Sequence, residues 1–145
     1  MAERSLPRVL IVDDQPDMAR ALARVFAGDA EVIISASGSD VLERVAGGEN
    51  FSLVICDVMM PGMSGPELFE RIRQFAPATA AAFVFTTGGV DAEHQRRLRE
   101  TGVPCLLKPV ETSALRGLLP GANPRLDHKG AAGASASTTA AARKA

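Results

Sequence analysis

The charged side chains that could carry out chemistry follow three short apolar runs of the chain. Asp13 and Asp14 come directly after Val-Leu-Ile-Val, Asp57 follows Leu-Val-Ile-Cys, and Lys108 follows Cys-Leu-Leu. Three carboxylates that lie close together need a cation, because like charges raise the pKa of at least one of them. Carboxylate oxygens with no His or Cys nearby suit Mg²⁺, which keeps several waters. An alternative is that the acidic pair only caps the helix that begins near Pro16, but the matching position of Asp57 disfavours it.

Together with a hydroxyl group, these residues have the chemistry needed to handle a phosphoryl group. Asp57 can act as a carboxylate nucleophile, while a metal ion and Lys108 neutralise charge on the transferring oxygens. Lys108 is the only lysine in residues 1–128, which favours a compact charge placed for a purpose over a solubilising surface lysine. Thr87 stands beside two glycines and could bond the phosphoryl group, although a turn residue is the simpler interpretation of Thr87 alone.

Short apolar runs alternate with amphipathic stretches across residues 1–119. Runs typical of buried strands occur at residues 9–12, 32–34, 51–55, 83–85 and 103–107. Helical spacing occurs within residues 18–26, 41–45, 64–72, 91–101 and 115–119, with Ser64 and Pro66 typical of a helix start. Five strand–helix pairs with short connections predict an α/β fold, a doubly wound parallel sheet with helices on both faces. Ligands bind such sheets beyond the carboxyl ends of the strands, where the acidic residues and the lysine would meet.

Composition and charge argue against several classes of protein. The chain has 145 residues and a net charge of −1, which gives no electrostatic reason to expect a nucleic acid or a membrane as partner. It has no Trp and no Tyr, so an aromatic platform for stacking bases is absent. There is no signal peptide and no apolar span of about 20 residues, and Cys56 and Cys105 form no C-x-x-C pair. We therefore expect a cytoplasmic protein with reduced thiols.

The chain is expected to divide into a domain and a tail. Residues 7–119 contain the alternating pattern, whereas residues 120–145 consist mainly of Ala, Gly, Ser and Thr with one large aliphatic residue, Leu126. Such a segment cannot bury enough apolar area to offset the entropy of ordering it. A low-complexity, disordered tail is therefore predicted. Met1 and this tail together favour a complete small protein.

Four motifs in a fixed order resemble the receiver domain of two-component response regulators, over essentially all of residues 7–119. They are VLIVDDQP (9–16), LVICDVMMPGMSGPEL (53–68), VFTTGG (84–89) and CLLKP (105–109). The resemblance implies a flavodoxin-like, five-stranded parallel sheet of strand order 2-1-3-4-5. It also implies a regulatory phosphoacceptor rather than an enzyme, which takes its phosphoryl group from a sensor histidine kinase or a phosphotransfer protein. The phosphorylated form would then change the binding of a downstream protein that the sequence does not identify.

The resemblance also assigns the metal site. Asp57 would be the phosphoacceptor, and Asp14 would bind Mg²⁺ directly, together with Asp57 and the backbone carbonyl of Met59. Asp13 would act mostly through water. Met59 and Gly89 occupy positions that tune the lifetime of the phosphoryl group in the family. Neither side chain can orient an attacking water, so a long-lived phosphoryl form is predicted.

The switch residues follow the family in part. Lys108 would pair with the phosphoryl oxygens, and the Lys108–Pro109 peptide bond would be cis. Thr86 and Thr87 both qualify for the switch hydroxyl, and counting from the phosphoacceptor favours Thr87. Cys105 stands where family members often carry Tyr or Phe, so the usual threonine–aromatic switch cannot operate in its standard form.

A polar helix at residues 91–101 is the expected partner face. It carries Arg96, Arg97 and Arg99, and its only large apolar residue is Leu98, so it has little apolar anchoring and could shift cheaply. An ordinary solvated helix is an equally good interpretation of this segment.

Several alternatives stay open. The chain could be a stand-alone regulator or the receiver of a hybrid kinase. It could be a degenerate receiver that acts as a phosphorylation-independent scaffold, which Cys105 favours; the presence of the full acidic pair, Asp57 and Lys108 disfavours it. An Mg²⁺-dependent aspartyl phosphatase is disfavoured because Met59 stands where its general acid would be. A flavodoxin-like nucleotide binder is disfavoured because the acidic pair after the first strand would repel phosphate.

Overall fold

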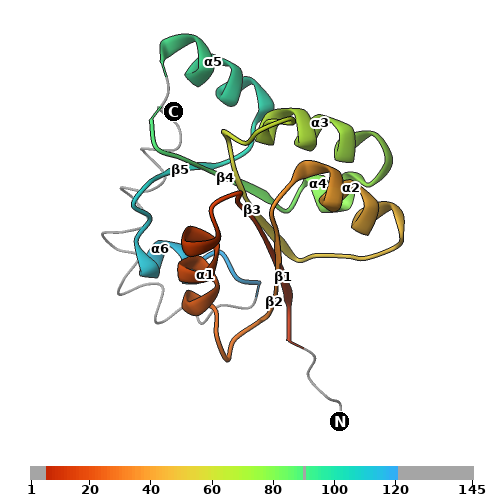
Figure 1. Ribbon diagram of the computed structural model, residues 1–145, viewed down its shortest axis with the longest axis vertical. Helices are drawn as coiled ribbons and strands as arrows, with labels where there is room; N and C mark the ends of the chain where they lie inside the picture. The colour runs from red at the N-terminus through yellow and green to blue at the C-terminus, as the bar shows by residue number, and fades with distance from the viewer. Residues whose placement is uncertain (1–5, 90, 121–145) are drawn as a thin grey trace.

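The computed structural model describes residues 6–89 and 91–120 of the chain. Five parallel strands form one sheet in the order β2-β1-β3-β4-β5 (Figure 1). This confirms the α/β class that the sequence pattern predicted and the strand order that the resemblance implied. The strands are β1 (Arg8–Val12), β2 (Glu31–Ser35), β3 (Leu53–Asp57), β4 (Phe83–Thr87) and β5 (Cys105–Leu107).

Helices cover both faces of the sheet. One face carries α1 (Pro16–Val25) and α6 (Thr112–Arg116), and the other carries α2 (Gly38–Ala46), α3 (Gly65–Phe75) and the short α4 (Pro77–Ala80). The remaining helix, α5 (Ala92–Thr101), lies at the end of the molecule beside β4 and β5 (Figure 1). It contributes Leu98 to the core beneath α2 and α3. Within the described parts of the chain, no helix has the length and apolarity needed to cross a membrane.

Successive residues of each strand point to opposite faces, and this alternation divides the core into two layers. Leu10, Val54 and Phe85 pack beneath α2 and α3. Ile55 and Leu106 pack on the other side, beneath α1 and α6. β1 from its second residue onward and β3 are buried throughout, as expected for central strands of a parallel sheet. The same alternation decides on which face the polar residues after each strand emerge.

The start of α3 follows from its local sequence. The Ser64 hydroxyl accepts a hydrogen bond from the Glu67 amide, and the Glu67 side chain accepts one from the Ser64 amide. This capping box satisfies two amides at the helix start. Pro66 stands in the first turn, where its missing N–H costs nothing. The predicted start of this helix is confirmed, and it fixes where the loop after β3 must end.

The structure corrects several predicted boundaries. β3 was expected at residues 51–55 but spans Leu53–Asp57, and β5 was expected from residue 103 but begins at Cys105. β4 continues through Thr87, which was expected in a loop. The reason is that strand ends depend on pairing with neighbours, such as Asp57 with Thr86, rather than on where an apolar run stops. Helix α4 was not predicted, because four residues are too few to show a helical period.

The predicted tail, residues 120–145, lies outside the described residues except for Pro120.

Candidate functional site

The carboxyl ends of the strands bring a lysine and acidic side chains together. The Lys108 ammonium lies 3.3 Å from Asp57 Oδ1 and 3.7 Å from Asp13 Oδ2. Carboxylate oxygens of Asp13, Asp14 and Asp57 all lie within 4.8 Å of one another. They come from three separate segments of the chain and meet because each stands at the carboxyl end of a strand in one parallel sheet.

Asp57 lies in surroundings that change the pKa of its carboxyl group. Asp57 is 7% exposed, and this burial raises the pKa of its carboxyl group above the ordinary value. The Lys108 ammonium opposes this rise, the nearby Asp13 charge adds to it, and a hydrogen bond from the Met59 amide favours the ionised form. A second positive charge beside Asp57 would therefore be stabilised, because it would offset both the burial and the Asp13 charge.

Asp13 provides the observation that tests whether a cation fits. Its backbone N–H donates to the Ser35 carbonyl at 3.1 Å, and its Oδ1 accepts from the Gln15 amide at 3.0 Å. Its Oδ2 is buried and has no hydrogen-bond partner within residues 6–89 and 91–120. A buried carboxylate oxygen that lacks a donor is costly. An all-carboxylate site of this kind suits a hard cation such as Mg²⁺.

The two threonines at the end of β4 differ in their surroundings. Thr87 Oγ1 accepts a hydrogen bond from the Gly89 amide at 3.1 Å, so it already organises the loop that follows. The Thr87 carbonyl accepts from the Lys108 amide at 2.8 Å, which ties the ends of β4 and β5 together. Thr86 is also buried, and its hydroxyl has no partner in the described part of the chain. Both candidates for the switch hydroxyl thus lie at the site, on opposite faces of the strand.

The loop after Asp57 returns tightly against the strand. The Gly65 amide donates to the Val58 carbonyl at 2.9 Å. A Cβ at Gly65 would lie only 2.6 Å from the Asp57 carbonyl oxygen. Gly65 was not among the predicted site residues. The available signal was a glycine between the N-cap Ser64 and Pro66, where most residues would serve as well for the helix.

The remaining predicted residues lie around the site rather than in it. The Met59 side chain is exposed at 59%. The Lys108–Pro109 peptide bond is cis, as the resemblance implied. Cys105 is buried beside Phe85 on the α2–α3 face, and burial raises the pKa of its thiol to about 11. A thiol with that pKa stays protonated and packs as a small apolar side chain.

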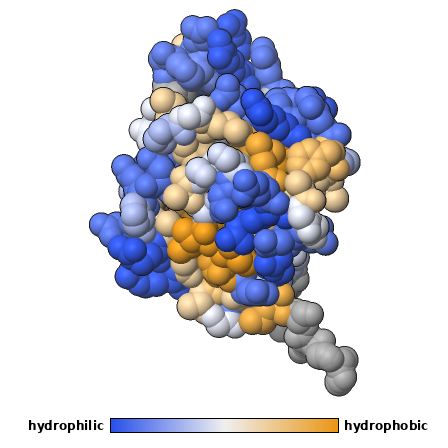
Figure 2. Space-filling model, turned by 45° about the vertical axis from the view of Figure 1, so that its right-hand side comes forward, coloured by the Kyte–Doolittle hydropathy of each residue, from blue (hydrophilic) through white to orange (hydrophobic). Residues whose placement is uncertain are grey.

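Helix α5 presents the arginines of the expected partner face. Arg96, Arg97 and Arg99 are exposed, and Arg97 pairs with Glu93 at 3.5 Å. Leu98 is the one buried residue of this helix, all of which is described. The α5 end of the molecule is strongly hydrophilic in the space-filling view (Figure 2). These positions agree with a solvated helix and with a polar docking face alike.

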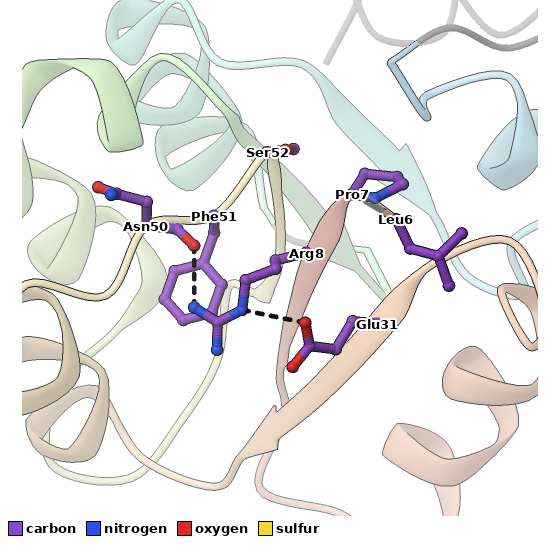
Figure 3. Close-up of a pocket in the computed structure, with 7 residues that line it drawn as sticks. All are labelled: Leu6, Pro7, Arg8, Glu31, Asn50, Phe51 and Ser52. Carbon is purple, nitrogen blue, oxygen red and sulfur yellow. Dashed lines mark hydrogen bonds and ion pairs between the residues drawn. The ribbon is translucent and has the colours of Figure 1, made fainter. Parts of the chain in front are cut away.

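A separate hollow lies at the opposite edge of the sheet. It has a volume of about 420 Å³ and lies at the starts of β1 and β2 and beside the segment before β3 (Figure 3). The Arg8 guanidinium fills its centre, pairs with Glu31 at 3.5 Å and Glu49 at 3.1 Å, and lies over the Phe51 ring at 4.9 Å. The charge of Arg8 is therefore already neutralised by two carboxylates. The three carboxylates and Lys108 lie instead at the carboxyl ends of the strands.

Known proteins are similar to this chain in sequence and in structure. Residues 9–119 match the family described as response regulator receiver domain. A response regulator receiver protein of Anaeromyxobacter sp. is 38% identical over 104 residues, which cover 71% of this chain and 43% of that protein. The sensor histidine kinase TmoS of Ectopseudomonas mendocina is 32% identical over 111 residues, which cover 76% of this chain and 11% of the kinase.

Solved structures agree with these sequence matches. The crystal structure of a CheY-like response regulator receiver domain protein from Methanospirillum hungatei JF-1 aligns with a TM-score of 0.67 and 30% identity. The alignment covers 77% of this chain and 88% of that chain. By contrast, the chain spans less than half the length of the two curated relatives named above.

Proposed function

This chain belongs to the response regulator receiver domain family of two-component signalling, and we propose that phosphorylation of Asp57 switches its binding to another protein. The observation that carries the proposal is the buried Asp57 carboxylate, held 3.3 Å from the Lys108 ammonium beside two further carboxylates. No structural role requires three carboxylates and a lysine to meet at the end of a sheet. A site that accepts a phosphoryl group and a cation requires the carboxylates and the lysine together.

Mg²⁺ is the cofactor that suits this donor set. Asp13, Asp14, Asp57 and the backbone carbonyl of Met59 would hold it, and the ion would supply positive charge to the oxygens of the transferring phosphoryl group. The unpartnered Oδ2 of Asp13 supports this assignment. As the family resemblance implies, Asp13 would act mainly through the waters of the ion, to which its Oδ2 is available.

The transfer step uses the chain's own residues in a defined order. An Asp57 carboxylate oxygen attacks the phosphorus of a phosphohistidine, a P–O bond forms, and the P–N bond breaks with its electron pair going to the histidine nitrogen. The Lys108 ammonium, which pairs with the Asp57 carboxylate before transfer, then pairs with the phosphoryl oxygens, which carry the negative charge after it. The Thr87 hydroxyl, which accepts from the Gly89 amide, would donate to a phosphoryl oxygen, and its movement towards that oxygen would release the amide.

The change at Thr87 is the event that a partner would detect. Releasing the Gly89 amide alters the loop that leads into α5, whose apolar anchor is Leu98. A helix with few buried contacts moves at low cost. We therefore retain the face carrying Arg96, Arg97 and Arg99 as the proposed docking surface. Cys105 cannot act as a ring that turns inward, so the coupling would run through the backbone after Thr87.

The family supports a proposal for the setting of the module. A receiver domain is a regulatory phosphoacceptor, and its phosphodonor would be a histidine kinase or a phosphotransfer protein of the cytoplasm. The similarity to part of a sensor histidine kinase keeps both a separate regulator and a receiver within a kinase as candidate settings. The proposed domain spans residues 7–119. Met59 and Gly89 remain the basis of the predicted long-lived phosphoryl form.

Intact-mass spectrometry with Mg²⁺ and a small-molecule phosphodonor tests the proposal. The parent chain should gain one phosphoryl group, Asp57→Asn should gain none, and Asp29→Asn should behave as the parent because Asp29 is exposed and lies away from the site. Equal labelling of the Asp57→Asn variant would contradict the assignment of the phosphoacceptor. If the folded parent takes up no label from this donor or from any sensor kinase, the chain is a phosphorylation-independent scaffold instead.

A further inference from the structure

The two edges of the sheet differ in how they are protected against pairing with another strand. The β5 edge is three residues long, with Pro104 before it and Lys108 and Pro109 after it. A short strand, prolines and a lysine are the usual devices that prevent an edge from adding a further strand. The β2 edge, at the other side of the sheet, is five residues long and contains no proline and no lysine. It is therefore the open edge of the two.

The outer side of β2 carries backbone groups that β1 does not use. The amide of Glu31, the first residue of β2, donates to the segment before β1 at 2.8 Å, and the carbonyl of Ser35, its last residue, accepts from the residue after β1 at 3.1 Å. Alternate residues of a strand direct their N–H and C=O groups to opposite sides, so Ile33 faces β1 as these two residues do. The N–H and C=O groups of Val32 and Ile34 therefore point away from β1. Among the described residues, β1 is the only strand that pairs with β2.

The side chains in the middle of this edge are apolar. Ile34 is 40% exposed, and Val32, on the same face of the strand, is only partly buried. The one charged residue of the strand, Glu31, stands at its beginning and pairs with Arg8. The middle of the edge thus offers exposed apolar side chains together with outward backbone groups, a combination that favours the addition of a strand.

We propose that a second copy of this chain pairs with this edge, so that two β2 strands run antiparallel about a two-fold axis at Ile33. This register sets Val32 opposite Ile34 of the partner subunit, and both residues have the outward N–H and C=O groups that such a pair exchanges. Glu31 then lies opposite Ser35 of the partner subunit, which keeps the two Glu31 charges apart, whereas a parallel pairing in register would bring them together. The edge is complementary to itself, as a two-fold contact requires.

The pairing would join two sheets into one and leave the phosphoacceptor site free. Asp57 stands at the carboxyl end of β3, and α5 lies beside β4 and β5, away from the β2 edge (Figure 1). The dimer would present two polar α5 faces, and a partner with two binding sites would gain affinity by contacting both. The contact consists of a few backbone hydrogen bonds and a short apolar strip. We therefore expect weak association, at the low end of interface sizes.

Engineered cysteines test the register in the full chain. Across a two-fold axis at Ile33, the two Cα atoms of residue 33 would lie about 4.5 Å apart, which a disulfide can bridge. The two Cα atoms of residue 31 would be roughly 14 Å apart, four residues out of register. Mild oxidation should therefore link Ile33→Cys into a covalent dimer and leave Glu31→Cys unlinked, although residue 31 is the more exposed. The buried Cys56 and Cys105 are common to both variants.

Sedimentation velocity from about 10 µM to about 1 mM follows association without cysteines added. Ile34→Lys places a charge diagonally across the axis from its own copy and should weaken association by about tenfold. Leu107→Lys is the matched control, because Leu107 is also an exposed apolar residue of an edge strand, at 51%. This variant should associate as the parent does. None of these readouts depends on phosphorylation, so they are independent of the proposed function.

The outcomes separate a second copy from other occupants of the edge. A parent chain that stays monomeric at about 1 mM would overturn the proposal, and so would linkage of Glu31→Cys as fast as that of Ile33→Cys. An equal loss of association in Ile34→Lys and Leu107→Lys would also overturn it, because the contact would lie elsewhere. A monomer whose Val32 and Ile34 amides exchange slowly with solvent would show that another segment of the same chain covers this edge instead.

Discussion

Replacing Gly65, at the start of α3, by alanine should displace the backbone of the phosphoacceptor Asp57. A Cβ at this position would lie 2.6 Å from the Asp57 carbonyl oxygen and 3.2 Å from the Val58 Cα atom. Both are backbone atoms of β3 and the residue after it, and they cannot move aside as the end of a flexible side chain can. The Asp57 backbone itself must therefore shift.

The size of the effect follows from this overlap. An added methyl group in a packed site costs about 1–3 kcal/mol, and contact with backbone places Gly65→Ala near 2 kcal/mol. For a domain of this size that corresponds to a fall in melting temperature of about 8 °C. Displacement of the Asp57 carboxylate should lower the rate of phosphoryl uptake by about tenfold, because in-line attack depends on its position.

Two measurements check these values on the same samples. Far-UV circular dichroism follows unfolding, since the chain has no Trp or Tyr to report by fluorescence. Intact-mass spectrometry with a small-molecule phosphodonor follows uptake. Gly38→Ala is the matched control, because the atom closest to its added Cβ is the Met63 sulfur, at 2.8 Å, on a flexible side chain. We expect Gly38→Ala to stay within about 1 kcal/mol of the parent, since alanine also favours the helix.

The outcome can refute the reasoning directly. If Gly65→Ala melts with the parent and takes up label at the same rate, the close approach of the loop to β3 does not constrain Asp57. If Gly38→Ala is destabilised as strongly as Gly65→Ala, the distinction between backbone and side-chain neighbours is wrong.

Two further predictions concern groups outside the site. The Ser35 hydroxyl, and then the Arg44 guanidinium, hold the pKa of Asp40 below its usual value, so this carboxylate adds stability above about pH 4 that is lost as the pH falls through its folded-state pKa. Urea unfolding should show Asp40→Asn less stable than the parent by under about 1 kcal/mol at pH 6, because the side chain is 43% exposed. The difference in unfolding free energy between the two proteins should become smaller towards pH 3. A difference that grows in acid would contradict the direction of the pKa shift. Cys56 and Cys105 are buried, and burial raises the pKa of both thiols, so a thiol reagent at pH 8 should modify neither in the native protein and both after unfolding. Rapid modification of native protein would show that this core opens readily.

The sequence alone was enough to predict the architecture, because period and order are local properties. Continuous β-branched runs such as Val9–Val12 indicate strands buried on both faces, and amphipathic stretches between them imply parallel pairing. Once the sheet is parallel, the residues after its strands must meet at one edge. For that reason Asp57 and Lys108 could be assigned to one site although 50 residues lie between them.

Boundaries and contacts were decided only by the tertiary structure. β4 continues through Thr87 because β5 pairs with it, which no property of the apolar run at residues 83–85 could show. Three contacts depend on distances between strands and loops that are far apart in the chain. They are the ion pairs of Lys108, the close approach of Gly65 to β3, and the position of the Thr86 hydroxyl, which has no partner among the described residues. Sequence patterns determine which side chains face inward, whereas packing determines which atoms those side chains contact. The chemistry of this site depends on these contacts.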